Sequence, residues 1–202
     1  MSEVATTVPV TGQWFPTPEG TRWWFDSGSL ALDFAYTGRV ADETPEDQPG
    51  ETLHSAADLT AWLAGRLPSA AASARDLADA IRLRGAISGL ARAASAGIAG
   101  DSAEIDLLNL YAATPDIPPA LTGGTRRAGR STARPAQALS AMAREAIDLF
   151  SETELIRFRE CAADDCQLIF YDESRSNNRR WCSMQRCGNR AKVRAHRSKS
   201  RA

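Results

Sequence analysis

The chain has 202 residues, of which 43% are hydrophobic, and its 24 Lys and Arg nearly balance its 25 Asp and Glu, for a net charge of -1. This composition excludes a chain that is disordered throughout, and no stretch approaches the roughly 18 consecutive apolar residues that a membrane span needs. The first residues lack the basic and apolar regions of a secretion signal, so we expect a cytoplasmic protein with no membrane partner.

The near-neutral charge is the sum of two unlike parts. Residues 174–202 contain ten Lys and Arg and no Asp or Glu, a charge of +10, whereas residues 1–173 carry -11. A basic segment of this kind is typical of proteins that contact a polyanion such as nucleic acid, while the acidic part would be repelled by it.

The first part of the chain is polar, and helical signals begin after it. Residues 1–22 contain three prolines and few apolar residues, so we expect a partly ordered N-terminal segment. Apolar residues 23–25 and 30–34 then flank a short turn. In this turn, Ser27 or Ser29 can cap a helix over the second apolar segment, because a serine side chain accepts a hydrogen bond from a helix's first turn.

Helical periodicity dominates the middle of the chain. Apolar residues recur every three or four positions in four segments, residues 58–67, 75–96, 101–113 and 135–150. Stretches rich in Gly and Pro, residues 38–52 and 114–135, are expected loops, the second long enough for a short hairpin. A short helix over 152–159 follows. We therefore expect a multihelical N-terminal domain over residues 23–156.

All four cysteines lie close together near the C-terminal end. They form the pairs Cys161-x4-Cys166 and Cys182-x4-Cys187, which are separated by fifteen residues. Because a reducing cytoplasm disfavours disulfides, and Zn2+ takes four thiolates tetrahedrally, this spacing predicts one structural Zn2+ per chain. Four thiolates leave no open position for water, so a catalytic zinc is not expected. A redox pair or four unrelated buried thiols are the alternatives.

We call residues 157–202 the finger. Within it, residues 167–171 have a strand-like pattern, and residues 189–200 contain neither Gly nor Pro and suit a helix. The sequence therefore predicts a mainly α protein, in which a multihelical N-terminal domain precedes a small four-cysteine zinc finger made of a β-hairpin and a basic helix.

Four arginines of this predicted helix share one face, at steps of four, three and four: Arg190, Arg194, Arg197 and Arg201. Like charges at this spacing destabilise an isolated helix by roughly 0.2–0.5 kcal/mol per pair, and a polyanion removes that cost. DNA is the expected partner, since arginine neutralises phosphates and reads guanine bidentately. Two alternatives stay open: a solvated tail that touches RNA nonspecifically, and neutralisation of zinc-bound sulfurs by Arg180, Arg186 and Arg190.

The finger closely resembles the CGNR zinc finger, named for the tetrapeptide at residues 187–190. The matching positions are the four cysteines with Ile169, Phe170, Asp172, Ser174, Arg175, Arg179, Arg180, Trp181, Ser183, Gly188, Asn189, Arg190 and Lys192. Upstream, Leu30-Ala31-Leu32-Asp33-Phe34-x2-Thr37 resembles the opening motif of the ABATE domain, and Leu83-Arg84-x-Ala86 resembles its later helix. Tyr36 departs from the pattern, because the family often has Asn there.

The resemblance implies a bacterial, stress-induced transcription regulator, in which the N-terminal domain senses a small-molecule effector and the finger binds DNA. By the match, Cys161, Cys166, Cys182 and Cys187 are the zinc ligands. The residues expected to meet nucleic acid are Arg175, Arg179, Arg180, Asn189, Arg190 and Lys192, together with Arg194, Arg197 and Arg201 of the helix face. The alternative is a zinc-stapled RNA-binding accessory protein.

In the N-terminal domain, the candidate ligand-binding residues are Asp33, Phe25 and Arg84. A carboxylate between two apolar residues must be exposed, paired with a base such as Arg84, or directed into a pocket. An internal ion pair or a helix-capping role is the structural alternative. An enzyme is not expected, because the sequence has no nucleophile–base pair, phosphate-binding loop or open metal site.

Overall fold

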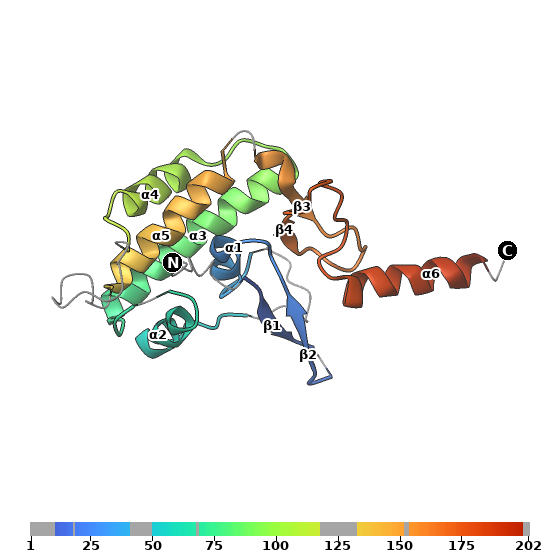
Figure 1. Cartoon of the computed structure of the whole chain (residues 1–202), viewed down its shortest axis with the longest axis horizontal. Helices are drawn as coiled ribbons and strands as arrows, with labels where there is room; N and C mark the ends of the chain where they lie inside the picture. Colours follow the sequence, from blue (N-terminus) through green and yellow to red (C-terminus); the bar gives the residue numbers. More distant parts are fainter. Residues whose placement is uncertain are drawn as a thin grey trace, which may run out of the picture.

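The computed structural model describes residues 11–17, 19–40, 50–67, 69–117, 133–151 and 154–199. Helices pack side by side in the N-terminal part, the finger packs against one end of them, and one helix projects away from both (Figure 1). The predicted fold class, mainly α with a small four-cysteine finger, is confirmed. None of the helices in these ranges combines the length and apolar character that crossing a bilayer requires.

An aromatic hairpin precedes the helices. Strands β1 (Gln13–Pro16) and β2 (Arg22–Phe25) pair antiparallel. Side chains alternate between the two faces, so that Phe15 and Phe25 are buried while Trp14 and Trp24 face solvent. Residues 1–22 were expected to be only partly ordered, but β1 and the start of β2 lie within this range. The alternation of aromatic residues is the sequence signal that indicates these strands.

Helix α1 (Leu30–Ala35) begins where the sequence predicts, and Ser29 is its cap. The Ser29 Oγ accepts a hydrogen bond from Leu32 N at 3.0 Å. All six residues of α1 are buried, because the helix packs against α3 and α5, while Gly12 and Gln13 at the start of the hairpin donate hydrogen bonds to Asp33.

The four predicted longer helices are all present: α2 (Ala56–Ala64), α3 (Ala74–Ala96), α4 (Ser102–Ala112) and α5 (Pro135–Leu149). Capping boxes start two of them, with Ser55 and Asp58 in α2 and Ser73 and Asp76 in α3. Helix α3 packs against α1, α2, α4 and α5 and forms the centre of the domain. Residues 41–49 and 118–132, which include most of both predicted loops, lie outside the described part of the chain.

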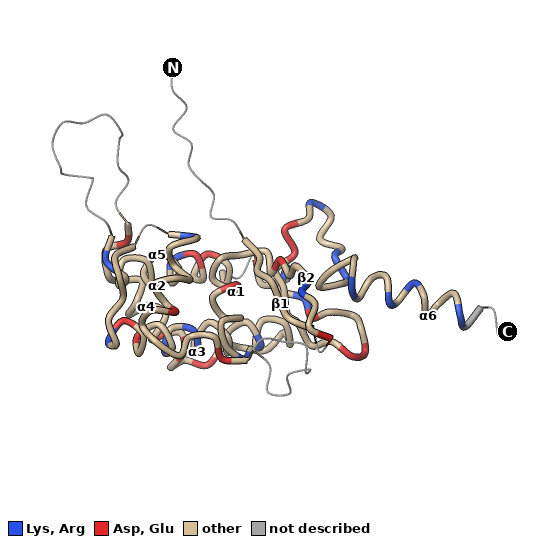
Figure 2. Tube along the Cα trace, turned by 90° about the horizontal axis from the view of Figure 1, so that it is seen from below, with Lys and Arg blue, Asp and Glu red and all other residues tan. Residues whose placement is uncertain are grey.

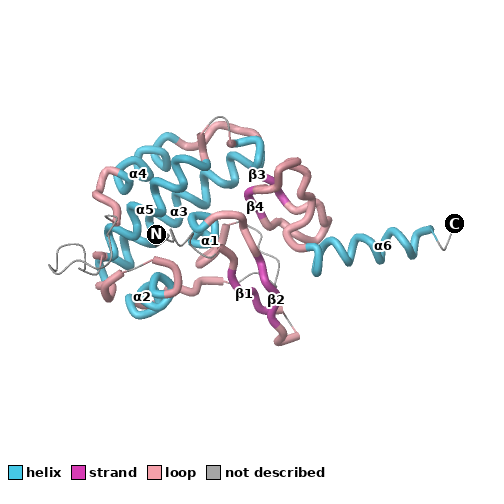
Figure 3. Tube along the Cα trace, in the orientation of Figure 1, coloured by secondary structure: helices cyan, strands magenta, loops and turns pink. Residues whose placement is uncertain are grey.

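The short helix expected over 152–159 is wrong for the described residues of that range. Residues Leu155–Arg157 form a single 3-10 turn, η1, and Phe158–Glu160 form strand β3. Strand β3 pairs antiparallel with β4 (Ile169–Tyr171), which is the predicted strand (Figure 3). The pairing is favourable because Phe158, Ile169 and Phe170 become buried together. The finger ends in the π-helical turn η2 (Met184–Gly188) and helix α6 (Asn189–Lys199), which the sequence placed at 189–200.

Candidate metal centre and nucleic-acid interface

Two turns bring the four cysteines together. Cys161 directly follows β3, and a turn in which Cys166 N donates to Ala163 O returns the chain to it. Cys182 precedes η2, and Cys187 lies inside it. A backbone hydrogen bond of 2.9 Å from Ala162 N to Arg180 O joins the two cysteine-bearing segments.

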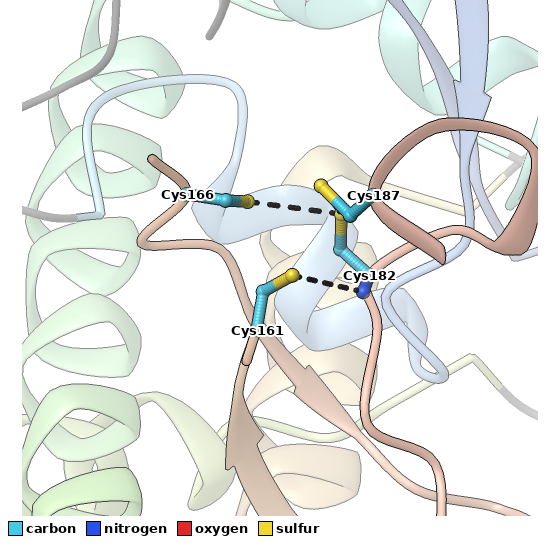
Figure 4. A group of neighbouring side chains, drawn as sticks. All are labelled: Cys161, Cys166, Cys182 and Cys187. Atoms are coloured by element: carbon cyan, nitrogen blue, oxygen red, sulfur yellow. Dashed lines mark hydrogen bonds between the residues drawn. The ribbon is translucent and has the colours of Figure 1, made fainter. Parts of the chain in front are cut away.

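The spacing of the sulfur atoms fits a tetrahedral cation (Figure 4). All four cysteines are buried, and their sulfurs lie within 4.8 Å of one another. Cys166 Sγ lies 3.7 Å and Cys187 Sγ 3.4 Å from Cys182 Sγ. Zinc–sulfur bonds of about 2.3 Å set the sulfurs of a tetrahedron about 3.8 Å apart, whereas a disulfide requires about 2.0 Å. The four thiols therefore match a Zn2+ site and not a pair of disulfides.

The thiols depend on one another for hydrogen bonds. Bonding to Cys166 lowers the pKa of Cys161 to about 7, and bonding to Cys161 lowers that of Cys187. The same network raises the pKa of Cys166 and of Cys182, because these thiols supply the protons. Four buried thiolates repel one another, so a divalent cation is the group that would let all four lose their protons together.

Polar groups around the sulfurs come from the finger itself. Cys182 N donates to Cys161 Sγ at 3.4 Å, and Arg190 Nη2 donates to Cys187 Sγ at 3.2 Å. Arg190 therefore lies where it can neutralise a sulfur, as one predicted alternative requires, and it also belongs to the basic helix.

Helix α6 carries basic side chains along its length and points away from the rest of the molecule (Figure 2). A hollow of about 440 Å³ runs along it, and its lining residues are Gln185, Arg186, Asn189, Arg190, Val193, Arg194 and Arg197. Two acidic residues of the first cysteine turn reach this surface: Arg190 Nη1 lies 3.1 Å from Asp165 Oδ2, and Arg194 Nη2 lies 2.9 Å from the same oxygen. Asp164 lies 3.7 Å from Arg194 Nη1.

The residues expected to meet nucleic acid do not all lie on one surface. Asn189, Lys192, Arg194 and Arg197 are exposed on α6, with Arg190 half-buried beside them. Arg175 and Arg180 are exposed on the loops of the finger, away from α6 in the chain. Arg201 lies outside the described residues. Sequence reasoning did not place Gln185 or Val193 at this surface, although their spacing before and within the helix puts them on the same face.

Arg179 is used differently from its neighbours. Its Nη2 donates to the carbonyl oxygens of Asp26 and Cys182, and its Nε donates to Trp181 O at 3.1 Å. The guanidinium also lies 4.1 Å from the centre of the Phe170 ring. These contacts turn Arg179 inward, where it joins the finger to the loop before α1.

That loop and α1 hold the finger in place. The buried Tyr36 hydroxyl donates to Ile169 O at 3.0 Å and accepts from Ile169 N at 2.8 Å. Tyr171 N donates to Ser27 O at 2.8 Å. Gly28 has φ of +85, and a Cβ there would collide with Tyr171 O, so both the conformation and the close approach require glycine.

The structure does not bring Asp33, Phe25 and Arg84 together. Asp33 is fully buried and accepts hydrogen bonds from Ser27 Oγ, at 2.6 Å, and from Gly12 N. Burial raises the pKa of Asp33 to about 6. Arg84 does not pair with it, because both of its terminal nitrogens bind the carboxylate of Glu51. Phe25 packs in the aromatic core beside Tyr36.

A second carboxylate, which the sequence did not point to and which is half-buried, lies at the start of α1. Glu145 of α5 accepts hydrogen bonds from Leu30 N at 3.0 Å and from Ala31 N at 3.1 Å. It therefore caps the helix from outside, at the end where the helix dipole favours negative charge. Burial raises the pKa of Glu145 to about 7.

Two known families match the chain, one over the helical N-terminal part and one over the finger. Residues 28–153 match the profile of the ABATE family, described as "Putative stress-induced transcription regulator". Residues 157–200 match the profile of the CGNR zinc finger. A search of curated proteins found no sequence that matches the chain.

Proposed function

Because the chain belongs to the ABATE family and ends in a CGNR zinc finger, we propose that it is a transcription regulator whose finger binds DNA through α6. The observation that carries the proposal is the row of arginines on α6, the helix that projects from the molecule at the end of a segment of charge +10, whereas residues 1–173 carry -11. Opposite charges of this kind orient a protein on a polyanion, with the basic helix forward.

In this proposal Cys161, Cys166, Cys182 and Cys187 hold one Zn2+ per chain. When bound, the ion supplies a structural cross-link, since four thiolates fill its coordination shell. The residues around the site form two three-residue strands and short turns, whose packing against the rest of the chain a bound ion would reinforce. They fix the start of α6, because Cys187 lies two residues before the helix begins.

The acidic turn at Asp164 and Asp165 gives the basic surface a built-in competitor. Both aspartates pair with arginines that DNA phosphates would also bind. Binding of a duplex would therefore exchange two carboxylates for phosphates, and it would release the counterions condensed on the DNA.

The N-terminal domain is proposed to sense a small molecule, as its family description as a regulator suggests. The buried residues Asp33, Phe25 and Arg84 are poor candidates for direct contact, because each is already engaged by neighbouring groups. The effector site is better sought elsewhere on the molecule.

Fluorescence anisotropy with zinc-loaded full-length protein tests DNA binding. We expect binding to a labelled duplex to weaken steeply with salt and to favour some genomic sequences over random DNA. Substituting Arg190, Arg194 and Arg197 by Gln should weaken it more than about tenfold and reduce the slope of log K against log salt by up to about 2.7. Arg75→Gln, an exposed arginine of α3, is the control and should change neither.

Two results would contradict the proposal. Equal affinity for every duplex would leave a basic surface without a regulator's selectivity. A preference for structured RNA over duplex DNA would favour the alternative of an RNA-binding accessory protein, since A-form RNA is recognised by shape and 2′-hydroxyl contacts.

A further inference from the structure

A cavity of about 590 Å³ lies where the N-terminal hairpin meets the finger. One wall is formed by Trp24 and Asp26, at the end of β2, and the other by finger residues 178–185. Ligand sites are frequent at junctions of this kind, and the volume lies within the range of sites for small organic molecules. The cavity lies outside the positions that the sequence analysis assigned to an effector.

Flat apolar groups form much of this cavity. Trp24 and Trp181 face it from the two sides, and Met184 lies beside them. The side chains of Trp24 and Met184 are 38% and 51% exposed, which is high for large apolar groups. Aromatic rings stack on tryptophan, and the flexible thioether of methionine adapts to a ring edge. These three residues suit a planar aromatic molecule.

The charge at the cavity comes from Arg180. Its guanidinium lies 5.2 Å from the centre of the Trp181 ring, and within the described residues it makes no hydrogen bond or ion pair. The lining also carries Arg179 and Asp26, whose opposite charges offset each other: Arg179 Nη2 donates to the backbone oxygen of Asp26, and Asp26 Oδ1 accepts from Gly28 N. With one carboxylate against two guanidinium groups, a ligand in this cavity would meet a net positive charge, with Arg180 beside the Trp181 ring.

We infer that this cavity binds a small planar aromatic anion, with its ring against Trp24 and Trp181 and its negative group at Arg180. This assignment deepens the ligand-sensing part of the proposed function and rests on it for its regulatory meaning. The occupant would touch both halves of the molecule, and through Met184 it would touch the turn η2 that leads directly into α6. It is thus placed where a small molecule can change how the basic helix is held.

The test uses the zinc-loaded full chain with two probes of the same shape, 1-naphthoate and its neutral counterpart 1-naphthamide. Binding is followed by NMR through the indole N–H signals of the five tryptophans, assigned by single Trp→Phe variants. We expect both probes to shift the signals of Trp24 and Trp181, and we expect naphthoate to bind about five- to tenfold more tightly because of its charge. Shifts confined to other tryptophans would overturn the assignment.

Matched variants separate the two parts of the site. Trp24→Ala should weaken both probes at least tenfold, whereas Trp14→Ala should not, although Trp14 is the cross-strand neighbour of Trp24 and lies 5.3 Å from it, centre to centre. Arg180→Gln should remove the preference for naphthoate, and Arg175→Gln, another exposed arginine of the finger, should preserve it. Retention of the preference in Arg180→Gln would overturn the role of Arg180, and this exposed position is safe for folding even if Trp24→Ala is not.

Duplex binding by the same samples distinguishes this inference from the proposed function. Probe binding without any duplex binding would remove the DNA-binding proposal and leave the cavity as a ligand site. Duplex binding with no response of Trp24 or Trp181 to either probe would remove the cavity assignment alone. A threefold or larger change in duplex affinity on saturation with naphthoate, lost in Trp24→Ala, would show that ligand binding in the cavity regulates duplex binding.

Discussion

Polar side chains are buried in both halves of the molecule, but their hydrogen bonds are completed in different ways. In the N-terminal domain, Asp33 accepts from Ser27 Oγ and Gly12 N, and Glu145 accepts from two backbone N–H groups of α1. In the finger, the four sulfurs lie mainly against one another. The carboxylates therefore receive their hydrogen bonds from the chain itself, without an external group. The thiols need a cation if all four are to ionise together.

This difference indicates that the carboxylates have a structural role, whereas the cysteines are arranged to bind a ligand. Asp33 and Glu145 brace α1 and the loop that carries Ser27, whose carbonyl in turn accepts a hydrogen bond from Tyr171 N of the finger. They act on the finger through the chain's own contacts. The cysteines, by contrast, are arranged as ligands of an added ion would be. Substitutions in the two regions should accordingly differ in size and in whether metal content changes.

The largest effect is expected from Cys187→Ser, which removes one of the four sulfurs. Structural zinc in small fingers contributes roughly 10–16 kcal/mol of binding free energy, most of which stabilises the fold around it. We expect the metal content of the dialysed protein to fall well below one ion per chain, the finger's amide signals to lose dispersion, and duplex binding to disappear. Elemental analysis and NMR provide the measurements. Ser183→Ala, a neighbour that holds no metal, is the control, and unchanged zinc in Cys187→Ser would remove the ligand assignment.

A smaller loss is expected when the attachment of the finger is weakened and its metal ligands are kept. Tyr36→Phe removes the hydroxyl that bonds both Ile169 N and Ile169 O in a fully buried site. Each buried group left unpaired costs about 1–3 kcal/mol. The free energy of unfolding in urea should therefore fall by at least about 2 kcal/mol, with zinc content unchanged. Tyr111→Phe removes a half-buried hydroxyl bonded to Asp79 and should cost clearly less; equal losses would argue against the anchoring role.

A pH-dependent effect distinguishes the half-buried Glu145 from the thiols. Burial raises the pKa of Glu145 from 4.5 to about 7, and the nearby charges of Asp33 and Glu173 act in the same direction. The folded protein thus holds a proton that the unfolded chain releases, so Glu145 should lower stability as pH rises from about 4.5 to 7. Urea unfolding of the protein and of Glu145→Gln across this range should show the stability difference moving in favour of the variant. Glu160→Gln, at an exposed position, should show no such trend; a constant difference for Glu145→Gln would contradict the prediction.

The sequence predicted the parts of the molecule that local pattern determines. Apolar periodicity located α2 to α5, and cysteine spacing identified the four residues that cluster. The sequence offered Ser27 or Ser29 as the cap of α1, and the structure shows Ser29. These features depend on neighbours within a few positions along the chain. The family resemblance predicted the zinc ligands and the DNA contacts of the finger from a motif alone, and it therefore treated Arg179 as a DNA contact like its neighbours.

What the sequence could not show depends on contacts between distant segments. Glu145 caps α1 across 115 positions, and Tyr36 reaches Ile169 across 133. The sequence offered Asp33 as a partner for Arg84, yet Arg84 pairs with Glu51, because the segment after α1 places the Glu51 side chain against α3. The segment before Cys161 carries a helical pattern but forms β3, since pairing with β4 buries Phe158. In each case tertiary packing decides between local alternatives.

The smallest effect is expected at the exposed edge of the basic surface, where Asp165 pairs with Arg190 and Arg194 at 3.1 and 2.9 Å. Exposed ion pairs contribute about 0.2–1 kcal/mol, so Asp165→Asn should raise duplex affinity two- to fivefold by freeing both arginines for phosphates. The gain should shrink with added salt, because salt screens the competing pair. Asp106→Asn on α4 removes the same charge far from α6 and corrects for net charge in anisotropy titrations. If Asp165→Asn instead weakens binding, the carboxylate holds the arginines in a binding geometry and does not compete with DNA for them.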